Sequence, residues 1–146
     1  MPAANTPTNL EEEKEIKSRY AEFRAECASR VTGYEMYLNE KSALSVGENE
    51  LQTEYEQRWA NGGLMFLGGF SDILTDPAAN ETAAQFIREK ISNIVTDPEV
   101  AKILMPEHKV GCKRLCADTG YYETFNRSNV SLIDVSSDPI KEITKQ

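Results

Sequence analysis

The chain has 146 residues but only one histidine, His108, and it lacks the short motifs of common nucleotide-binding or hydrolytic enzymes. It contains no G-x-G-x-x-G segment and no Walker lysine, so it has no glycine-rich phosphate loop of its own. A single histidine without a nucleophile signal does not support a Ser/His/Asp triad. Any chemistry must therefore come from other residue types.

Positive charge is also scarce. The chain has 16 Lys and Arg against 24 Asp and Glu, a formal net charge of −8. A general nucleic-acid binder needs a basic face that releases counterions, so this balance argues against one. The whole excess of acid lies in residues 1–104, whereas residues 105–146 are balanced, with cations at Lys109, Lys113 and Arg114.

Cysteine is sparse and odd in number, because only Cys27, Cys112 and Cys116 are present, with no disulfide-framework spacing. This usage predicts a reducing, cytoplasmic location. The first residues have neither a positive n-region nor an apolar h-region, so no signal peptide is predicted, and no apolar run is long enough for a membrane span. Without an export signal, we interpret three N-x-Ser/Thr sequons as chance, at Asn80, Asn126 and Asn129.

Apolar spacing and helix-start signals predict helices over about 10–30, 48–60, 77–95 and 98–104. Thr8 or Asn9 can cap the first, and the repeated Thr-Asp-Pro at 75–77 and 96–98 can open the last two. Asn61-Gly-Gly ends the second helix. The strongly apolar stretch 64–74 must be buried, and its paired glycines suggest either a close backbone approach or a bend between two short pieces. Segment 31–38 is either a short strand or irregular.

The character of the chain changes after Pro106. Residues 107–118 are predicted as extended or looped, and 121–125 as one short turn. Segments 129–135 and 140–144 are predicted as two strands joined by a turn at 136–139. The expected fold is mainly α with a short C-terminal β-hairpin, after an extended leader over residues 1–9. A C-terminus so soon after the start of a strand suggests a truncated chain.

The best candidates for chemistry are the adjacent cations Lys113 and Arg114. In extended backbone, successive side chains point to opposite faces, so the two would reach different ligands or two ends of one ligand. Lysine is a point charge suited to a phosphate, and arginine is a planar fork suited to an anion that develops during a reaction. The alternative is a pair of solvated surface cations beside a turn.

His108, Cys112 and Cys116 follow one another at intervals of four residues, which resembles metal-ligand spacing. On a helix they would share a face, but Gly111 and Pro106 argue against a helix here. The spacing also lacks a fourth ligand and matches no common zinc module, so no metal site is predicted.

Several segments together resemble flavin-dependent Baeyer–Villiger monooxygenases of the cyclohexanone monooxygenase kind. They are YEQRWANGG at 55–63, FSDILTDPAAN at 70–80, AQFIREKI at 84–91, VTDPEVAKILMP at 95–106 and GCKRLCADTGYYETFNRSNV at 111–130. The resemblance extends from about residue 11 to 144, and the Lys-Arg…Tyr-Tyr…Asn-Arg-x-Asn-Val run is its most specific part.

The resemblance implies an enzyme that uses FAD, NADPH and O2 to insert oxygen into a ketone, giving an ester or lactone through a flavin peroxide. It implies that residues 10–106 are a helical insertion and 107–146 a partial return, by a loop and two strands, into an α/β NADP-binding Rossmann-like domain, truncated here. Lys113 matches the lysine that contacts the NADP 2′-phosphate. Arg114 matches the arginine that stabilises the negatively charged peroxyflavin.

Both nucleotide-binding fingerprints of that family are absent from this chain. We therefore expect a fragment of such an enzyme, inactive as this chain alone. The alternative is a non-catalytic binding module that associates with a separate Rossmann-domain polypeptide. Neither hypothesis involves a nucleic acid or a membrane.

Overall fold

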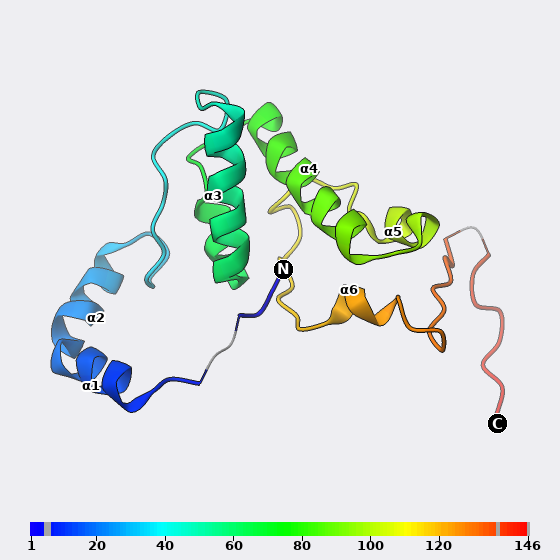
Figure 1. Cartoon of the computed structure of the whole chain (residues 1–146), viewed down its shortest axis with the longest axis horizontal. Coiled ribbons are helices and arrows are strands. Elements are labelled where there is room, and N and C mark those ends of the chain that lie inside the picture. Colours follow the sequence, from blue (N-terminus) through cyan, green and yellow to red (C-terminus); the bar gives the residue numbers. More distant parts are fainter. Residues whose placement is uncertain (5–6, 137, 146) are drawn as a thin grey trace.

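Helices connected by long irregular segments make up this protein, for which a computed structural model describes residues 1–4, 7–136 and 138–145 (Figure 1). Six α-helices and one 3₁₀ helix occur in this part of the chain. They are α1 (Leu10–Ser18), α2 (Tyr20–Ser29), α3 (Glu48–Asn61), η1 (Gly63–Gly68), α4 (Pro77–Ile94), α5 (Pro98–Leu104) and α6 (Tyr121–Thr124). No helix of the described residues is long and apolar enough to cross a membrane.

The predicted helix starts are confirmed. Asn9 forms a capping box with Glu12, and the side chains of Asp76 and Asp97 accept hydrogen bonds from the first turns of α4 and α5. Each of these two helices has proline at its first position, where a missing N–H is harmless. The predicted helix over 10–30 is instead two helices, because the chain breaks at Arg19.

The core is an aromatic cluster between α3, η1 and α4. The Phe66 side chain is fully buried and stacks on Tyr55 and Phe86, with ring centroids 5.3 and 5.7 Å apart. Trp59 meets Phe66 and Phe86 edge-on, as aromatic quadrupoles favour. Within the apolar stretch 64–74, Phe66, Phe70 and Ile73 are buried, whereas Leu64 and Leu74 are 48% and 58% exposed. Helix α4 presents its apolar face to this cluster.

Asp72 fastens the loop before α3 to the turn before α4. Its carboxylate accepts hydrogen bonds from the Ser42 hydroxyl, at 2.5 Å, and from the Ala43 backbone N–H, at 2.9 Å. Burial raises the pKa of this carboxyl, but these hydrogen bonds outweigh burial and leave its pKa below the ordinary value. Ionisation of the Asp72 carboxyl therefore stabilises the folded chain.

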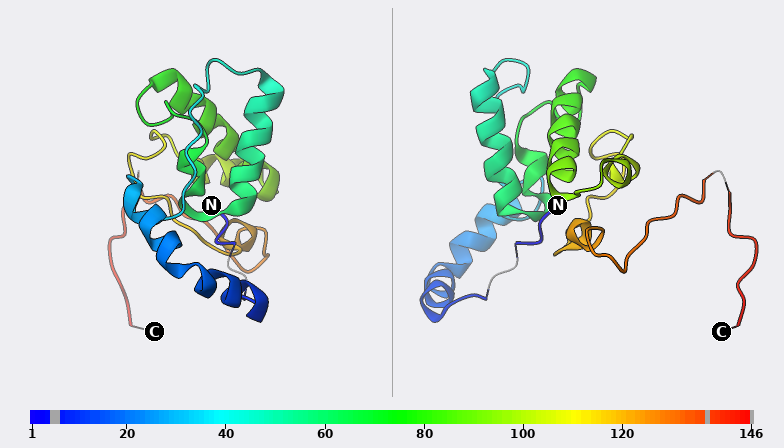
Figure 2. Two further views of the ribbon diagram at one scale, coloured as in Figure 1. Left: turned by 90° about the vertical axis from the view of Figure 1, so that its left-hand side faces the viewer. Right: turned by 45° about the vertical axis from the view of Figure 1, so that its right-hand side comes forward.

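Helices α1 and α2 stand apart from the aromatic core, and among the described elements they pack only against each other (Figure 2). Neither helix has a buried residue. The apolar residues Ile16 of α1 and Tyr20 of α2 are 40% and 52% exposed. Their apolar surface packs against no other described element.

The predicted C-terminal β-hairpin is wrong. The described residues contain no strand over 129–135 or 140–144, and hence no part of an α/β sheet, only an isolated parallel bridge between Pro2 and Asp118. Residue 137 of the predicted turn, and residues 5 and 6 of the predicted leader, lie outside the described residues.

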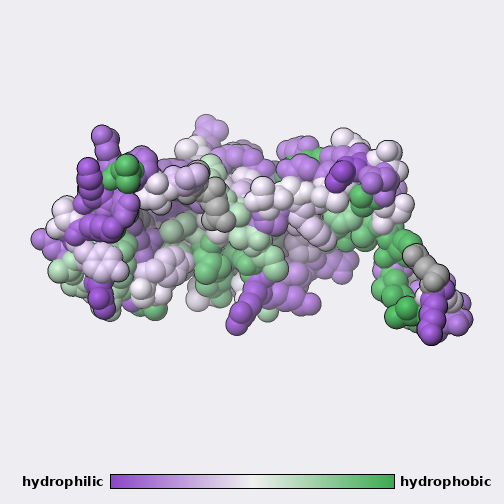
Figure 3. All heavy atoms as spheres, turned by 90° about the horizontal axis from the view of Figure 1, so that it is seen from below, coloured by the Kyte–Doolittle hydropathy of each residue, from purple (hydrophilic) through white to green (hydrophobic). Residues whose placement is uncertain are grey.

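The reason for this error is physical. A strand is defined by a ladder of hydrogen bonds to a neighbour, and two strands alone are marginal in water. The segment has strand-like composition, yet it runs away from the helices, as the right view of Figure 2 shows. Ile133, Ile140 and Ile143 are 76%, 72% and 91% exposed, and apolar surface is visible on this projecting segment in Figure 3.

Candidate functional site

The cation pair lies in the irregular segment between α5 and α6, which is held at both ends. At the first end, the buried side chain of Asn80 on α4 forms hydrogen bonds with the backbone N–H and carbonyl of Val110. Its Oδ1 accepts from the Val110 N–H at 3.0 Å, and its Nδ2 donates to the Val110 carbonyl at 2.9 Å. The same Nδ2 donates to the Ile73 carbonyl at 2.8 Å. Helix α4 therefore carries the start of the segment.

At the second end, Asp118 pairs with the first residues of the chain. The Ala3 N–H donates to the Asp118 carbonyl at 2.8 Å, and the Asp118 N–H donates to the Met1 carbonyl at 2.9 Å. The Pro2 carbonyl in turn accepts from the Gly63 N–H at the start of η1. The segment is thus tied through residues 1–3 to the aromatic core.

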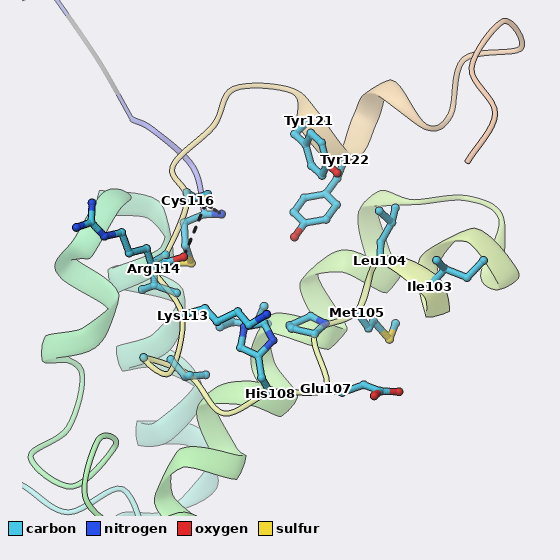
Figure 4. Close-up of a pocket in the computed structure, with 16 residues that line it drawn as sticks. Ile103, Leu104, Met105, Glu107, His108, Lys113, Arg114, Cys116, Tyr121 and Tyr122 are labelled. Atoms are coloured by element: carbon cyan, nitrogen blue, oxygen red, sulfur yellow. Dashed lines mark hydrogen bonds between the residues drawn. The ribbon is translucent and has the colours of Figure 1, made fainter. Parts of the chain in front are cut away.

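Lys113 and Arg114 lie between these two anchors, and both are exposed. Figure 4 shows their side chains extending in different directions, Lys113 toward His108 and Arg114 away from it. Neither cation forms an ion pair with any described residue. Two charges without protein counter-charges are available to bind anions.

Both cations line one open cavity of about 540 Å³ between α4, α5 and α6 (Figure 4). One side of its lining is apolar, from Ile103, Leu104 and Met105 at the end of α5. Charged and polar groups from the segment 107–116 form another side, and the tyrosines of α6 also line it. This combination of an apolar wall with a few convergent polar groups is typical of small-molecule sites.

Tyr122 is the half-buried aromatic of this cavity, and it packs edge-on to Tyr121 with ring centroids 5.2 Å apart. Burial, and secondarily the nearby Asp118 carboxylate, raise the pKa of the Tyr122 hydroxyl above its ordinary value. The phenol is therefore neutral at physiological pH and can donate a hydrogen bond into the cavity.

The three residues with metal-like spacing do not share one cavity wall. His108 and Cys116 line the cavity of the cation pair, whereas Cys112 lines a smaller one, of about 260 Å³, beside Asn80 and Leu74. No group of three or more His, Cys, Asp or Glu side chains within the described ranges is placed to hold a metal ion.

Two asparagines missed by the sequence analysis organise the segment. Asn80 holds its start, and Asn126, just after α6, ties the following chain to the end of α4 by accepting from the Thr96 N–H at 2.9 Å and donating to the Ile94 carbonyl at 2.7 Å. In the sequence, both stand out only as chance sequons. The available signal was a polar residue, Asn80, on the apolar face of a predicted helix beside Ala79 and Ala83.

Comparison with known proteins confirms the resemblance stated above. No protein-family model matches the chain. Cyclohexanone 1,2-monooxygenase from Acinetobacter sp is 39% identical over 148 residues, which cover 99% of this chain and 27% of that enzyme. A Baeyer–Villiger monooxygenase from Pseudooceanicola batsensis is 36% identical over 146 residues, with the same two shares. The chain thus spans about a quarter of the length of these relatives.

Solved structures agree. An oxidized steroid monooxygenase bound to NADP matches with a TM-score of 0.91 at 47% identity, over 96% of this chain and 27% of that one. An open crystal structure of cyclohexanone monooxygenase matches with a TM-score of 0.93 at 39% identity, over 99% and 28%. Other matching structures contain FAD, alone or with NADP. Nearly the whole chain is therefore similar to a segment that makes up about one quarter of the length of each of these FAD-dependent Baeyer–Villiger monooxygenases.

Proposed function

We propose that this chain is the part of a FAD- and NADPH-dependent Baeyer–Villiger monooxygenase that supplies two cations to the active site. In such an enzyme, a ketone and O2 are converted to an ester or lactone. The proposal is carried by one observation, namely that Lys113 and Arg114 line one cavity without protein counter-charges and point in different directions. Similarity to monooxygenases over nearly the whole chain supports it.

The residues present fit part of each cofactor. Lys113 is an unpaired ammonium suited to the NADP 2′-phosphate, and Arg114 is a permanently charged fork suited to the flavin. The flavin, when bound, supplies the activation of O2. Arg114 contributes a fixed positive charge where negative charge develops, and a preorganised charge of this kind lowers a barrier without reorganisation. The chain has no glycine-rich loop for either nucleotide, so most of each binding site lies elsewhere.

We further propose that residues 10–106 are the helical region and that the segment from residue 107 returns the chain to the nucleotide site. Because the nucleotide loops are absent, the chain by itself does not turn over a ketone. Its three free cysteines, two of them exposed, fit a cytoplasmic, reducing location.

The test is a segment exchange. The matching quarter of cyclohexanone monooxygenase is replaced by this chain, and NADPH oxidation and lactone formation are measured with cyclohexanone. An active hybrid that loses oxygenation on Arg114→Ala supports the proposal. A hybrid that folds and binds FAD but forms no lactone contradicts it. Turnover by the isolated 146-residue chain would contradict its proposed inactivity.

A second function follows from a different observation. The projecting segments 129–136 and 138–145 expose Ile133, Ile140 and Ile143, and exposed apolar surface of this kind is typical of a binding interface. The chain would then be a non-catalytic module bound to a separate Rossmann-domain polypeptide. Co-purification from the source organism distinguishes the two. A partner carrying G-x-G-x-x-G motifs favours the module, whereas chaperones alone in the eluate argue against it.

A further inference from the structure

Asn80 is the one polar side chain among the buried residues of the described core, only 5% exposed on the apolar face of α4. Buried polar side chains are normally hydrogen-bonded to other buried polar groups or to ordered water. Asn80 uses its acceptor and its amide donors on the peptide groups of Val110 and Ile73. No other described side chain bonds to Val110.

Two of these bonds join the Asn80 carboxamide to Val110 in both directions, donor to acceptor and acceptor to donor. A pair of this kind restrains both the distance and the orientation of the Val110 backbone relative to α4. Val110 is itself buried, at 7% exposed, so its N–H and carbonyl would be left without partners if the carboxamide were removed.

The restraint reaches the cations through a short length of chain. Lys113 follows Val110 by three residues, a span of at most about 10 Å. The next anchors are the Cys116 carbonyl, which accepts from the Met1 ammonium at 3.3 Å, and then Asp118. Between Val110 and Cys116, the Lys113 and Arg114 N–H groups donate no hydrogen bond within the described part of the chain. The place of both cations therefore depends on these anchors, and α4 holds the one on the Lys113 side.

We infer that Asn80 is a positioning residue, which sets where Lys113 and Arg114 stand relative to α4 and the cavity by holding Val110. What the cations bind rests on the proposed function, but their placement does not. Asn80 touches neither cation and acts only through the backbone of the segment.

The test compares amide hydrogen exchange and backbone chemical shifts by NMR in the 146-residue chain and three variants. In Asn80→Ala, the Val110 amide should exchange at least roughly tenfold faster, about the factor expected for one lost hydrogen bond. The signals of residues 108–116 should shift while those of α3 and the aromatic core stay in place. Unchanged exchange at Val110 would overturn the inference.

Two control variants separate positioning from general destabilisation. Ile91→Val removes a methylene from a fully buried side chain on the same helix, so it weakens α4 without touching the Val110 contact. It should leave the signals of 108–116 in place. Asn126→Ala removes the matching clamp at the other end of α4, and should shift residues 94–96 and 125–127 instead. If either control disturbs 108–116 as Asn80→Ala does, the inference fails.

A measurement on the unaltered chain covers the case in which Asn80→Ala does not fold. The Val110 amide should be protected to the level of the α4 amides, because its acceptor belongs to α4. Lys113 and Arg114 amides should exchange freely. If the Val110 amide exchanges as fast as the Lys113 and Arg114 amides, Asn80 does not restrain Val110 and the inference is refuted. No cofactor or substrate enters these measurements, so they succeed or fail independently of the monooxygenase proposal.

Discussion

Replacing Gly111 by alanine should destabilise the fold in two separable ways. Gly111 directly follows the clamped Val110 and has φ +87°, in the left-handed region that side chains disfavour. An alanine there is strained by about 1–2 kcal/mol. Its Cβ would also stand 2.5 Å from the Cδ2 of Leu74, well inside normal contact.

The clash can be relieved only partly. Leu74 is 58% exposed, so its side chain can swing outward and lose the buried part of its surface. Full burial of a leucine is worth about 1.5–3 kcal/mol, so this loss is at most about 1 kcal/mol. Alanine also restricts the unfolded chain, which offsets about 0.4–1 kcal/mol. The expected net destabilisation is about 1–2 kcal/mol.

Gly120→Ala is the matched control. Gly120 has φ +80°, but a Cβ added there meets nothing within 4 Å, so only the strain applies. Urea unfolding monitored by circular dichroism should find Gly111→Ala less stable than Gly120→Ala by about 1 kcal/mol, or a few degrees in Tm. In the Leu74→Ala background this excess should vanish. Equal effects at the two glycines, or an excess that survives without Leu74, would refute the packing argument.

Three further outcomes are expected. Phe66→Ala should lower the free energy of unfolding by about 3–5 kcal/mol, since Phe66 is fully buried among aromatic rings, whereas a loss below 1 kcal/mol would exclude it from the core. Because the folded-state pKa of Asp72 lies below its unfolded value, its stabilisation is present above the unfolded pKa and disappears as pH falls through the folded pKa. In acid unfolding measurements, the free energy of unfolding of Asp72→Asn should therefore depend less on pH than that of the unaltered chain. In the active hybrid, Lys113→Ala should raise the KM for NADPH roughly 10- to 100-fold, as for a lost charged contact, while Arg114→Ala should abolish oxygenation. If Lys113→Ala and Arg114→Ala changed only the affinity for NADPH, and to the same extent, the proposed division of roles between the two cations would be contradicted.

The helices could be predicted because their signals are local. Asp76-Pro77 and Asp97-Pro98 start α4 and α5 at the expected residues, and Asn61-Gly-Gly ends α3 where predicted. The break at Arg19 was missed although its signal is also local. The Ser18 hydroxyl bonds back to the Glu15 carbonyl, an alternative to helical pairing that serine commonly offers.

The error at the C-terminus has the opposite origin. Strand-like composition at 129–135 describes side chains that fit a pleated, half-buried surface, not a backbone preference that acts alone. A ladder requires a neighbour, and the described residues provide none beside this segment. The composition therefore indicates what kind of surface would cover Ile133 and Val135, and it says nothing about whether this chain contains that surface.

The site shows the same division between local and non-local information. Lys113 and Arg114 could be singled out because two adjacent cations in a non-helical segment are visible in the sequence. Their anchor could not, since Asn80 and Val110 are 30 residues apart and meet only when α4 packs against the returning chain. An asparagine on the apolar face of a helix is expected to be buried, and its carboxamide then needs hydrogen-bond partners. The sequence predicts that such a partner exists but does not identify it. In this chain that partner, Val110, lies three residues before Lys113, which makes the packing of α4 a condition for placing both charges.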